Sequence, residues 1–221
     1  MTTLSHPTLS AVWWPSAATG GQFGNMRGNT RGNARSPTRG AAWQRAAALA
    51  FAGSLLLTLS AKIQIPFWPV PMTMQTFVVL VLGAAYGPRL GMATMLLYLA
   101  EGALGLPVFA GTPEKGIGLA YMMGPTGGYL VGFVLAAGLT GWMAERGWDR
   151  NVAGVLIAMS LGHLLILGIG ALWLAQLIGW GKAWLFGLLP FWAATILKTL
   201  LAAAALPLAW RLTGRTRSGA R

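Results

Sequence analysis

The sequence predicts an all-α integral membrane protein with six transmembrane helices and both termini in the cytoplasm. The chain is 55% hydrophobic and only 9% charged, and its mean hydropathy is +0.60. A soluble domain carries about 25% charged residues, so lipid is the solvent that fits this composition. Cysteine is absent, which excludes disulfide bonds and thiolate metal sites.

The six predicted helices follow from the lengths of the apolar segments. A helix needs roughly 20 apolar residues to cross about 30 Å of hydrocarbon. The second and third segments are shorter, which fits helices that tilt or begin inside the protein beside irregular backbone. Pro190 and Pro207 interrupt the sixth. The membrane domain is expected over 41–211, with spans at 41–61, 73–87, 89–105, 125–144, 151–178 and 184–210.

The positions of the basic residues predict the orientation. All twelve arginines fall in, or at the edges of, the segments that six spans place on the same side as the termini. Lys62, Lys115 and Lys182 fall on the other side. Positive residues concentrate on the cytoplasmic side of membrane proteins, so both termini are expected there.

Both ends of the chain are expected to be basic tails. Residues 1–40 are rich in Gly, Ser, Thr, Asn and Arg and contain no apolar segment, which is typical of disorder and not of a secretory signal. Residues 212–221 form a short basic tail. The net charge of +12 fits attraction to anionic lipid, and no nucleic-acid partner is expected.

The outer connections between the spans are predicted at 62–72, 106–124 and 179–183. The first two are rich in proline, glycine and aromatic residues. Irregular backbone is tolerated at membrane depth only where it lies within protein or lines a cavity, and proline has no N–H to leave unpaired. These two connections are therefore expected to line a cavity that opens outward.

Lys198 stands in the middle of the sixth span. A lysine near the bilayer centre costs roughly 2.5–3.5 kcal/mol on insertion scales. The hypothesis is that its ammonium faces an outward-open pocket and awaits an anionic ligand. Glu101 and Glu114 are the acidic residues on the outer side, and either could pair with Lys198.

Other sequence features argue against ATP hydrolysis, metal binding and catalysis. No phosphate-binding G-x-x-x-x-G-K-[ST] motif occurs. His6 and His163 are far apart and no carboxylate cluster accompanies them, so no metal or cofactor is expected. Ser160 and His163 stand three residues apart on one helix, without an oxyanion-hole signature. His163 is instead expected to hydrogen-bond a neighbouring helix.

Two glycine- and alanine-rich segments are expected to mediate close helix packing. In "GPTGGYLVGF" (124–133), Pro125 suits the first turn of a helix. Gly128 and Gly132 allow another helix to approach, while Thr126 and Tyr129 supply polar groups at the cavity. The first span carries the A-x-x-x-A pairs Ala46/Ala50 and Ala48/Ala52, which are typical of membrane helix packing.

Four segments together point to a known family. "IQIPFWPVPMTMQTF", "GLPVFAG", "GPTGGYLVGF" and "GLLPFWAATILK" occur in this order. Over about residues 42–210 they closely resemble the BioY family, the biotin-binding S components of energy-coupling-factor (ECF) vitamin transporters. The resemblance implies the six-helix S-component fold in a bacterial cytoplasmic membrane, with no enzymatic activity. It also implies biotin capture at the outer face and uptake driven by a transmembrane T component and two ATPase subunits.

The resemblance assigns roles to residues as well. It implies that Ala46, Ala48, Ala50 and Ala52 face the T component. The family commonly has Gly-Asp-x-x-Lys in the last helix, whereas this chain has Ala194 and Thr195 before Lys198. The lysine is kept and the aspartate is not, which puts selectivity in doubt. The expected substrate-binding residues are Gln64, Trp68, Thr73, Gln75, Tyr98, Phe109, Thr126, Tyr129, Thr195 and Lys198.

Three alternative functions remain open at this point. The chain could be an S component for another small vitamin, or a solitary facilitator that moves biotin without an ATPase. An intramembrane hydrolase that uses Ser160 and His163 is the alternative from a different class.

Overall fold

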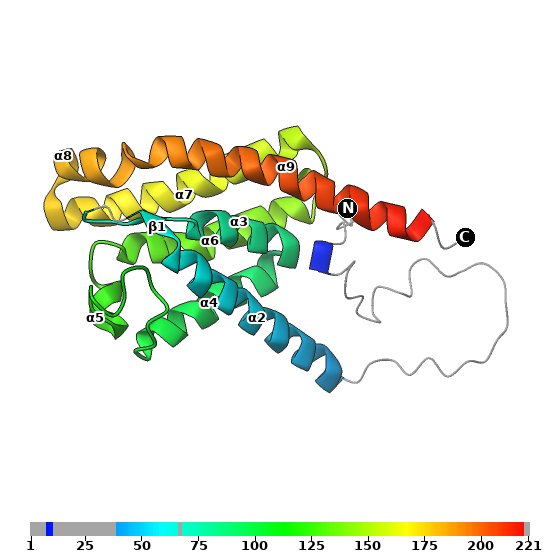
Figure 1. Ribbon diagram of the computed structural model, residues 1–221, viewed down its shortest axis with the longest axis horizontal. Coiled ribbons are helices and arrows are strands. Elements are labelled where there is room, and N and C mark those ends of the chain that lie inside the picture. Colours follow the sequence, from blue (N-terminus) through cyan, green and yellow to red (C-terminus); the bar gives the residue numbers. More distant parts are fainter. Residues whose placement is uncertain (1–7, 11–38, 66–67, 219–221) are drawn as a thin grey trace, which may run out of the picture.

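Six long helices dominate the part of the chain that the computed structural model describes, residues 8–10, 39–65 and 68–218 (Figure 1). They are α2 (Arg39–Lys62), α3 (Gln75–Tyr86), α4 (Pro88–Ala103), α6 (Gly127–Ala144), α7 (Val152–Ile178) and α9 (Phe191–Ser218). Short elements connect them: β1 (Gln64–Ile65), β2 (Met72–Thr73), α5 (Gly118–Met122), η2 (Trp148–Arg150), α8 (Trp180–Ala183) and η3 (Trp184–Leu188).

Each expected span overlaps one of these helices, although the expected sixth span, 184–210, includes η3 and ends before α9 does. Among the described residues, four segments are long and apolar enough to cross a membrane: Gly40–Lys62, Gly127–Ala144, Val152–Ile178 and Trp180–Leu212. Helix α3 has only 12 residues and α4 only 16, so their crossing of the bilayer stays a prediction. The protein is thus a helical, multi-pass membrane protein.

The helix boundaries follow from local sequence. Gly87 lies between α3 and α4 with φ of +82°, a value that glycine adopts readily, and Pro88 then occupies the first turn of α4. Helix α7 begins after Asn151, whose side chain accepts a 2.7 Å hydrogen bond from the backbone N–H of Gly154. Pro190 separates η3 from α9, whereas Pro207 lies inside α9, so only the first of the two prolines ends a helix.

Helix α6 lies at the centre of the bundle and packs against α3, α4 and α7. The contact between α6 and α7 is close because glycines face side chains and backbone across it. A Cβ atom at Gly128 would lie 2.3 Å from Trp173, and one at Gly132 would lie 2.9 Å from the backbone of Ile166. On α7, a Cβ atom at Gly170 would lie 2.3 Å from the ring of Tyr129. The glycine spacing predicted from the sequence therefore serves close helix packing.

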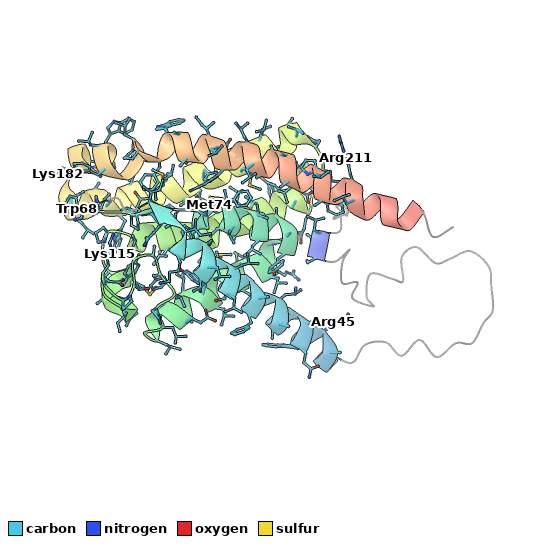
Figure 2. The ribbon with its side chains drawn as sticks, in the orientation of Figure 1. Arg45, Trp68, Met74, Lys115, Lys182 and Arg211 are labelled. Atoms are coloured by element: carbon cyan, nitrogen blue, oxygen red, sulfur yellow. The ribbon has the colours of Figure 1, made fainter. Side chains whose placement is uncertain are left out.

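The charged side chains labelled in Figure 2 gather at two ends of the molecule. Arg45 and Arg211 lie at one end, which we call the arginine end, and Lys115 and Lys182 lie at the other, which we call the lysine end. Between the ends, the helices expose large apolar side chains, such as Leu164, which is 69% exposed. An apolar surface of this extent fits contact with lipid.

The predicted tails are described only in part. Residues 1–7 and 11–38 lie outside the described residues, and the expectation of a basic N-terminal tail falls mostly there. At the other end, α9 continues as a helix to Ser218, beyond the expected end of the membrane domain.

Candidate functional site

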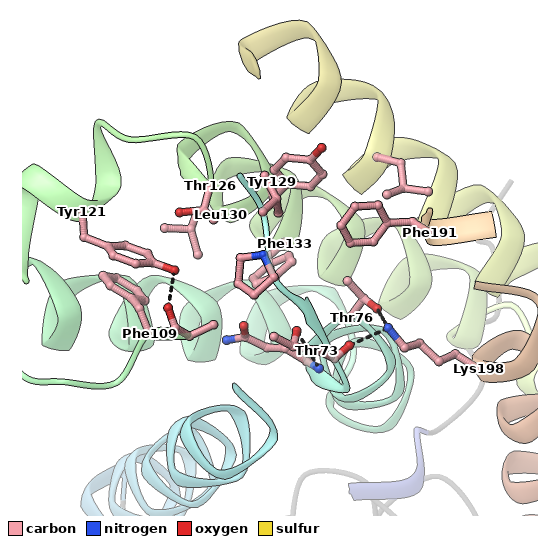
Figure 3. Close-up of a pocket in the computed structure, with 15 residues that line it drawn as sticks. Thr73, Thr76, Phe109, Tyr121, Thr126, Tyr129, Leu130, Phe133, Phe191 and Lys198 are labelled. Carbon is pink, nitrogen blue, oxygen red and sulfur yellow. Dashed lines mark hydrogen bonds between the residues drawn. The ribbon is translucent and has the colours of Figure 1, made fainter. Parts of the chain in front are cut away.

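A cavity of about 50 Å³ lies toward the lysine end, between α3, α6, α9 and the two long outer connections (Figure 3). Its lining residues are Val70, Pro71, Thr73, Gln75, Thr76, Phe109, Ala110, Tyr121, Thr126, Tyr129, Leu130, Phe133, Leu167, Phe191 and Lys198.

Lys198 supplies the positive charge of this cavity. Its side chain is only 6% exposed, and its ammonium donates hydrogen bonds to the backbone oxygen of Thr73 at 2.5 Å and to Oγ1 of Thr76 at 3.0 Å. An ammonium has three N–H donors, so these two bonds leave one donor for a molecule in the cavity. Figure 3 shows Lys198 across the cavity from Phe109 and Tyr121.

Helix α6 forms one wall of the cavity. Thr126, Tyr129, Leu130 and Phe133 all line it, and their spacing of i, i+3, i+4 and i+7 places them on one face of the helix. The hydroxyl of Tyr129 donates a 2.8 Å hydrogen bond to the backbone oxygen of Gly187 in η3. This bond fixes the ring and connects α6 to the segment before α9.

The first outer connection folds into a short hairpin over the cavity. Strands β1 and β2 pair antiparallel, with Gln64 opposite Thr73, and Val70 and Pro71 contribute to the lining. Gln75 begins α3 and is only 4% exposed. Its amide nitrogen donates a 2.6 Å hydrogen bond to the hydroxyl of Tyr98, so its amide oxygen keeps its capacity to accept.

The second outer connection brings aromatic rings to the cavity. Phe109 stacks on Tyr121, with ring centroids 4.9 Å apart, and meets Tyr98 edge-on at 5.4 Å. Phe109 comes this close to α4 because Gly102 has no side chain: a Cβ atom there would lie 2.0 Å from the ring. Tyr121 donates a 2.8 Å hydrogen bond to the backbone oxygen of Ala110, and burial raises the pKa of Tyr121 above its usual value.

The structure brings six of the ten expected substrate-binding residues together around the cavity: Thr73, Gln75, Phe109, Thr126, Tyr129 and Lys198. The other four are outside the lining. Trp68 is 70% exposed and meets Phe186 edge-on at 6.1 Å, and Tyr98 contacts Phe109 and Gln75. Gln64 lies on β1, and the half-buried Thr195 lies on α9.

Sequence reasoning missed the remaining lining residues, and some of them carried a signal. Leu130 and Phe133 share the helical face of Thr126 and Tyr129. The helical period from Thr126 and Tyr129 therefore predicts that they also line the cavity. Phe191 precedes Lys198 by seven residues, or two helical turns. Val70, Pro71, Ala110 and Tyr121 reach the cavity through the folding of the outer connections, for which no periodic pattern exists.

The predicted role of His163 agrees with its position. Its side chain is 2% exposed, and Nδ1 lies 3.2 Å from Oγ1 of Thr199 on α9 and 3.0 Å from the backbone oxygen of Met159. Ser160 is exposed on the outside of the bundle. His163 therefore links α7 to α9, and this placement does not favour a serine–histidine pair.

The two candidate acidic partners of Lys198 lie elsewhere. Glu101 on α4 accepts a hydrogen bond from the hydroxyl of Ser54 on α2, and Glu114 is exposed in the second outer connection. In the described structure, Lys198 is held by the oxygen atoms of two threonines.

The four alanines of α2 face different surroundings. Ala48 and Ala52 are exposed, Ala46 is half-buried and Ala50 is buried. Only the Ala48/Ala52 pair therefore presents a fully exposed surface of small residues.

Comparison with known proteins agrees with this geometry. The model of the BioY family matches residues 32–215. A protein named as a probable biotin transporter BioY from Pyrococcus horikoshii is 40% identical over 161 residues, which cover 73% of this chain and 91% of the relative. Biotin transporter BioY2 from Lactococcus lactis subsp. cremoris is 33% identical over 151 residues, which cover 67% of this chain and 81% of the relative. Both are named as transporters and not as enzymes.

A solved structure shares the fold. The crystal structure at 2.1 Å of the S-component for biotin from an ECF-type ABC transporter superposes with a TM-score of 0.66 at 23% sequence identity, and covers 79% of this chain and 94% of that chain. Together with the match over residues 32–215, this confirms the resemblance seen in the four sequence segments. The chain belongs to the BioY family.

Proposed function

We propose that this protein is the biotin-binding S component of an ECF transporter and captures biotin at the outer face of the membrane. The observation that carries the proposal is the position of Lys198, whose ammonium faces an otherwise largely apolar cavity with one donor to spare. The names of the relatives, which are biotin transporters, support the choice of ligand.

The chemistry of biotin matches the lining. Biotin has an anionic tail, an apolar bicyclic ring and a ureido group with two donors and one acceptor. In our proposal Lys198 binds the carboxylate, Phe109, Phe133 and Phe191 contact the ring, and Thr126 with Gln75 serves the ureido group. A ligand that leaves such buried polar groups unpaired binds weakly, which gives the site its selectivity.

Titration of the purified full-length chain with biotin tests the proposal. We expect saturable one-to-one binding at micromolar ligand or below, measured by calorimetry in detergent or nanodiscs. Riboflavin and thiamine serve as comparison ligands. Binding of one of these and not of biotin would assign the protein to another vitamin, and the absence of any binding would refute the S-component role.

We also propose the orientation with six spans and both termini in the cytoplasm of a bacterial cell. The separation of the arginine end from the lysine end supports it. Because the chain contains no cysteine, single-cysteine labelling has no background. In intact cells, an impermeant maleimide should label Lys115→Cys and Lys182→Cys but not Arg211→Cys. Labelling of Arg211→Cys would overturn the orientation.

Uptake is proposed to need a transmembrane T component and two ATPase subunits. The exposed Ala48/Ala52 pair is the part of α2 that could meet the T component closely. Ala48→Leu together with Ala52→Leu should abolish biotin uptake and leave biotin binding intact. Unchanged uptake would exclude this face, and uptake that persists in cells without the ATPases would favour a solitary facilitator.

A further inference from the structure

Three consecutive carbonyl groups of the second outer connection each accept a hydrogen bond from a side chain on a different helix. Tyr98 on α4 donates to the oxygen of Val108 at 2.9 Å. Lys62 at the end of α2 donates to the oxygen of Phe109 at 3.2 Å, and Tyr121 on α5 donates to that of Ala110 at 2.8 Å. The segment 106–116, which we call the outer loop, is thus attached by these side chains.

Lys62 makes the most extensive of these attachments. Besides Phe109, its ammonium reaches the backbone oxygen of Thr112 at 3.0 Å and Oγ1 of the same residue at 3.3 Å. The three contacts match the three N–H donors of a lysine. Oγ1 of Thr112 also donates to the oxygen of Phe109 at 2.7 Å, so the lysine holds one compact turn of the loop.

Burial distinguishes Lys62 from the two tyrosines. Tyr98 and Tyr121 are buried. Breaking their hydrogen bonds would leave buried polar groups with neither a protein partner nor water to bond to. Lys62 is exposed, so its ammonium can exchange the loop oxygens for water at small cost. It is therefore the attachment that can release first.

Release of the loop would open the cavity, because Phe109 and Ala110 belong to both. These two residues line the cavity, while the turn that contains them is bound by Lys62. Lys62 itself is not among the lining residues, and its ammonium is bound to oxygen atoms of the loop.

We propose that Lys62 is a positioning residue that latches the outer loop over the cavity and so sets how fast ligand enters and leaves. The identity of that ligand as biotin rests on the proposed function. In this proposal the latch contacts are the same whether the cavity is empty or filled, so losing them favours the open loop equally in both states. Association and dissociation should then accelerate together, and the equilibrium affinity should stay nearly constant.

Stopped-flow binding of biotin to Lys62→Met tests this rate effect. We expect both rate constants to rise about fivefold, the upper range for an exposed charged contact, while Kd changes by less than about twofold. Lys182→Met is the matched control, since Lys182 is an exposed lysine of the same end on α8. It should leave dissociation near that of the wild type and should not speed association, and Lys62→Arg, which keeps charge and donors, should restore slow exchange.

The direction of the change separates a latch from other roles. Loss of a positive charge alone slows the arrival of an anionic ligand, whereas loss of the latch speeds it. A raised Kd with an unchanged association rate would make Lys62 a ligand contact or a support of the wall, and would overturn the proposal. Unchanged rates would overturn it as well.

A measurement without ligand keeps the latch distinct from the proposed function. Hydrogen–deuterium exchange of the ligand-free protein should become faster in peptides that cover 106–116 in Lys62→Met, and not in Lys182→Met. This result would support the latch even if biotin did not bind. Equal exchange in both variants would overturn the latch and leave the assignment of biotin untouched.

Discussion

The ammonium of Lys198 lies 2.5 Å from the backbone oxygen of Thr73, which is 125 residues away in the chain. The bond joins α9 to strand β2 of the hairpin and satisfies a buried cation without a carboxylate. A ligand carboxylate that reaches Lys198 therefore uses the remaining donor or displaces a threonine oxygen. The first prediction tests this arrangement.

Lys198→Ala should weaken biotin binding by roughly tenfold to a hundredfold, because a hydrogen bond to a charged group contributes about 1.5–3 kcal/mol. The methyl ester of biotin has no anionic carboxylate and should lose far less affinity. Calorimetric titration of both ligands measures the difference. Equal losses for the two ligands would contradict a role of Lys198 in binding the carboxylate.

Thr76→Val serves as the companion variant at the same contact. It removes one acceptor from Lys198 and keeps the shape of the side chain. The freed donor is then available to the ligand, so biotin affinity should stay the same or rise. A loss as large as that of Lys198→Ala would show instead that Thr76 contacts the ligand.

Gly170→Ala should destabilise the protein and weaken ligand binding together. Its Cβ atom would lie 2.3 Å from the ring of Tyr129, and overpacking of this kind costs about 1–3 kcal/mol. Gly168→Ala on the same helix is the matched control, because a Cβ there would meet no atom of another helix within 4 Å. Thermal unfolding should separate the two variants, and equal melting temperatures would contradict the close contact.

Tyr121→Phe should lower stability by about 1–3 kcal/mol because it leaves the buried oxygen of Ala110 without its donor. Burial raises the pKa of Tyr121 above the usual value of a tyrosine, about 10. The hydroxyl therefore stays protonated below that value, and its contribution is lost only as the pH rises beyond it. The difference in melting temperature between wild type and variant should be constant from about pH 6 to 9, and a marked slope in this range would refute the assignment.

Trp210→Phe should destabilise the arginine end and leave biotin affinity unchanged. The indole N–H of Trp210 donates a 2.6 Å hydrogen bond to Asp149, whose side chain is 3% exposed, and losing a bond to a buried carboxylate costs about 1–3 kcal/mol. Phenylalanine keeps a ring for Arg150, which lies 4.8 Å from the indole. Trp142→Phe, at an exposed position, is the control. Equal unfolding of the two variants would speak against a structural role of the Asp149 bond.

The sequence predicted the cavity residues on helices better than those on connections. Thr126 and Tyr129 came from a helical segment whose period of 3.6 residues places Leu130 and Phe133 beside them. Lys198 was identified because a cation within an apolar span costs free energy, and such residues usually serve a function. In each case a regular period or an energetic cost was readable from the sequence.

The expected residues that lie outside the cavity lining, and the lining residues that sequence reasoning missed, depend on tertiary structure. Trp68 has a ring suited to a ligand wall, yet the hairpin leaves it 70% exposed. Tyr98 is fully buried behind Phe109. Phe109 lines the cavity and Tyr98 does not. Neither the path of an irregular connection nor the rotation of a helix about its axis follows from composition.

The close packing of α6 against α7 also has an evolutionary consequence. Gly128, Gly132 and Gly170 leave no room for even one added carbon, so the wall built on α6 can accept few substitutions. The hairpin and the outer loop are attached partly by hydrogen bonds to their backbones, and those of their side chains that are exposed, such as Trp68, are freer to vary. A descendant of this protein that took up a different vitamin would be expected to change these two connections first and to retain the glycines of the helices.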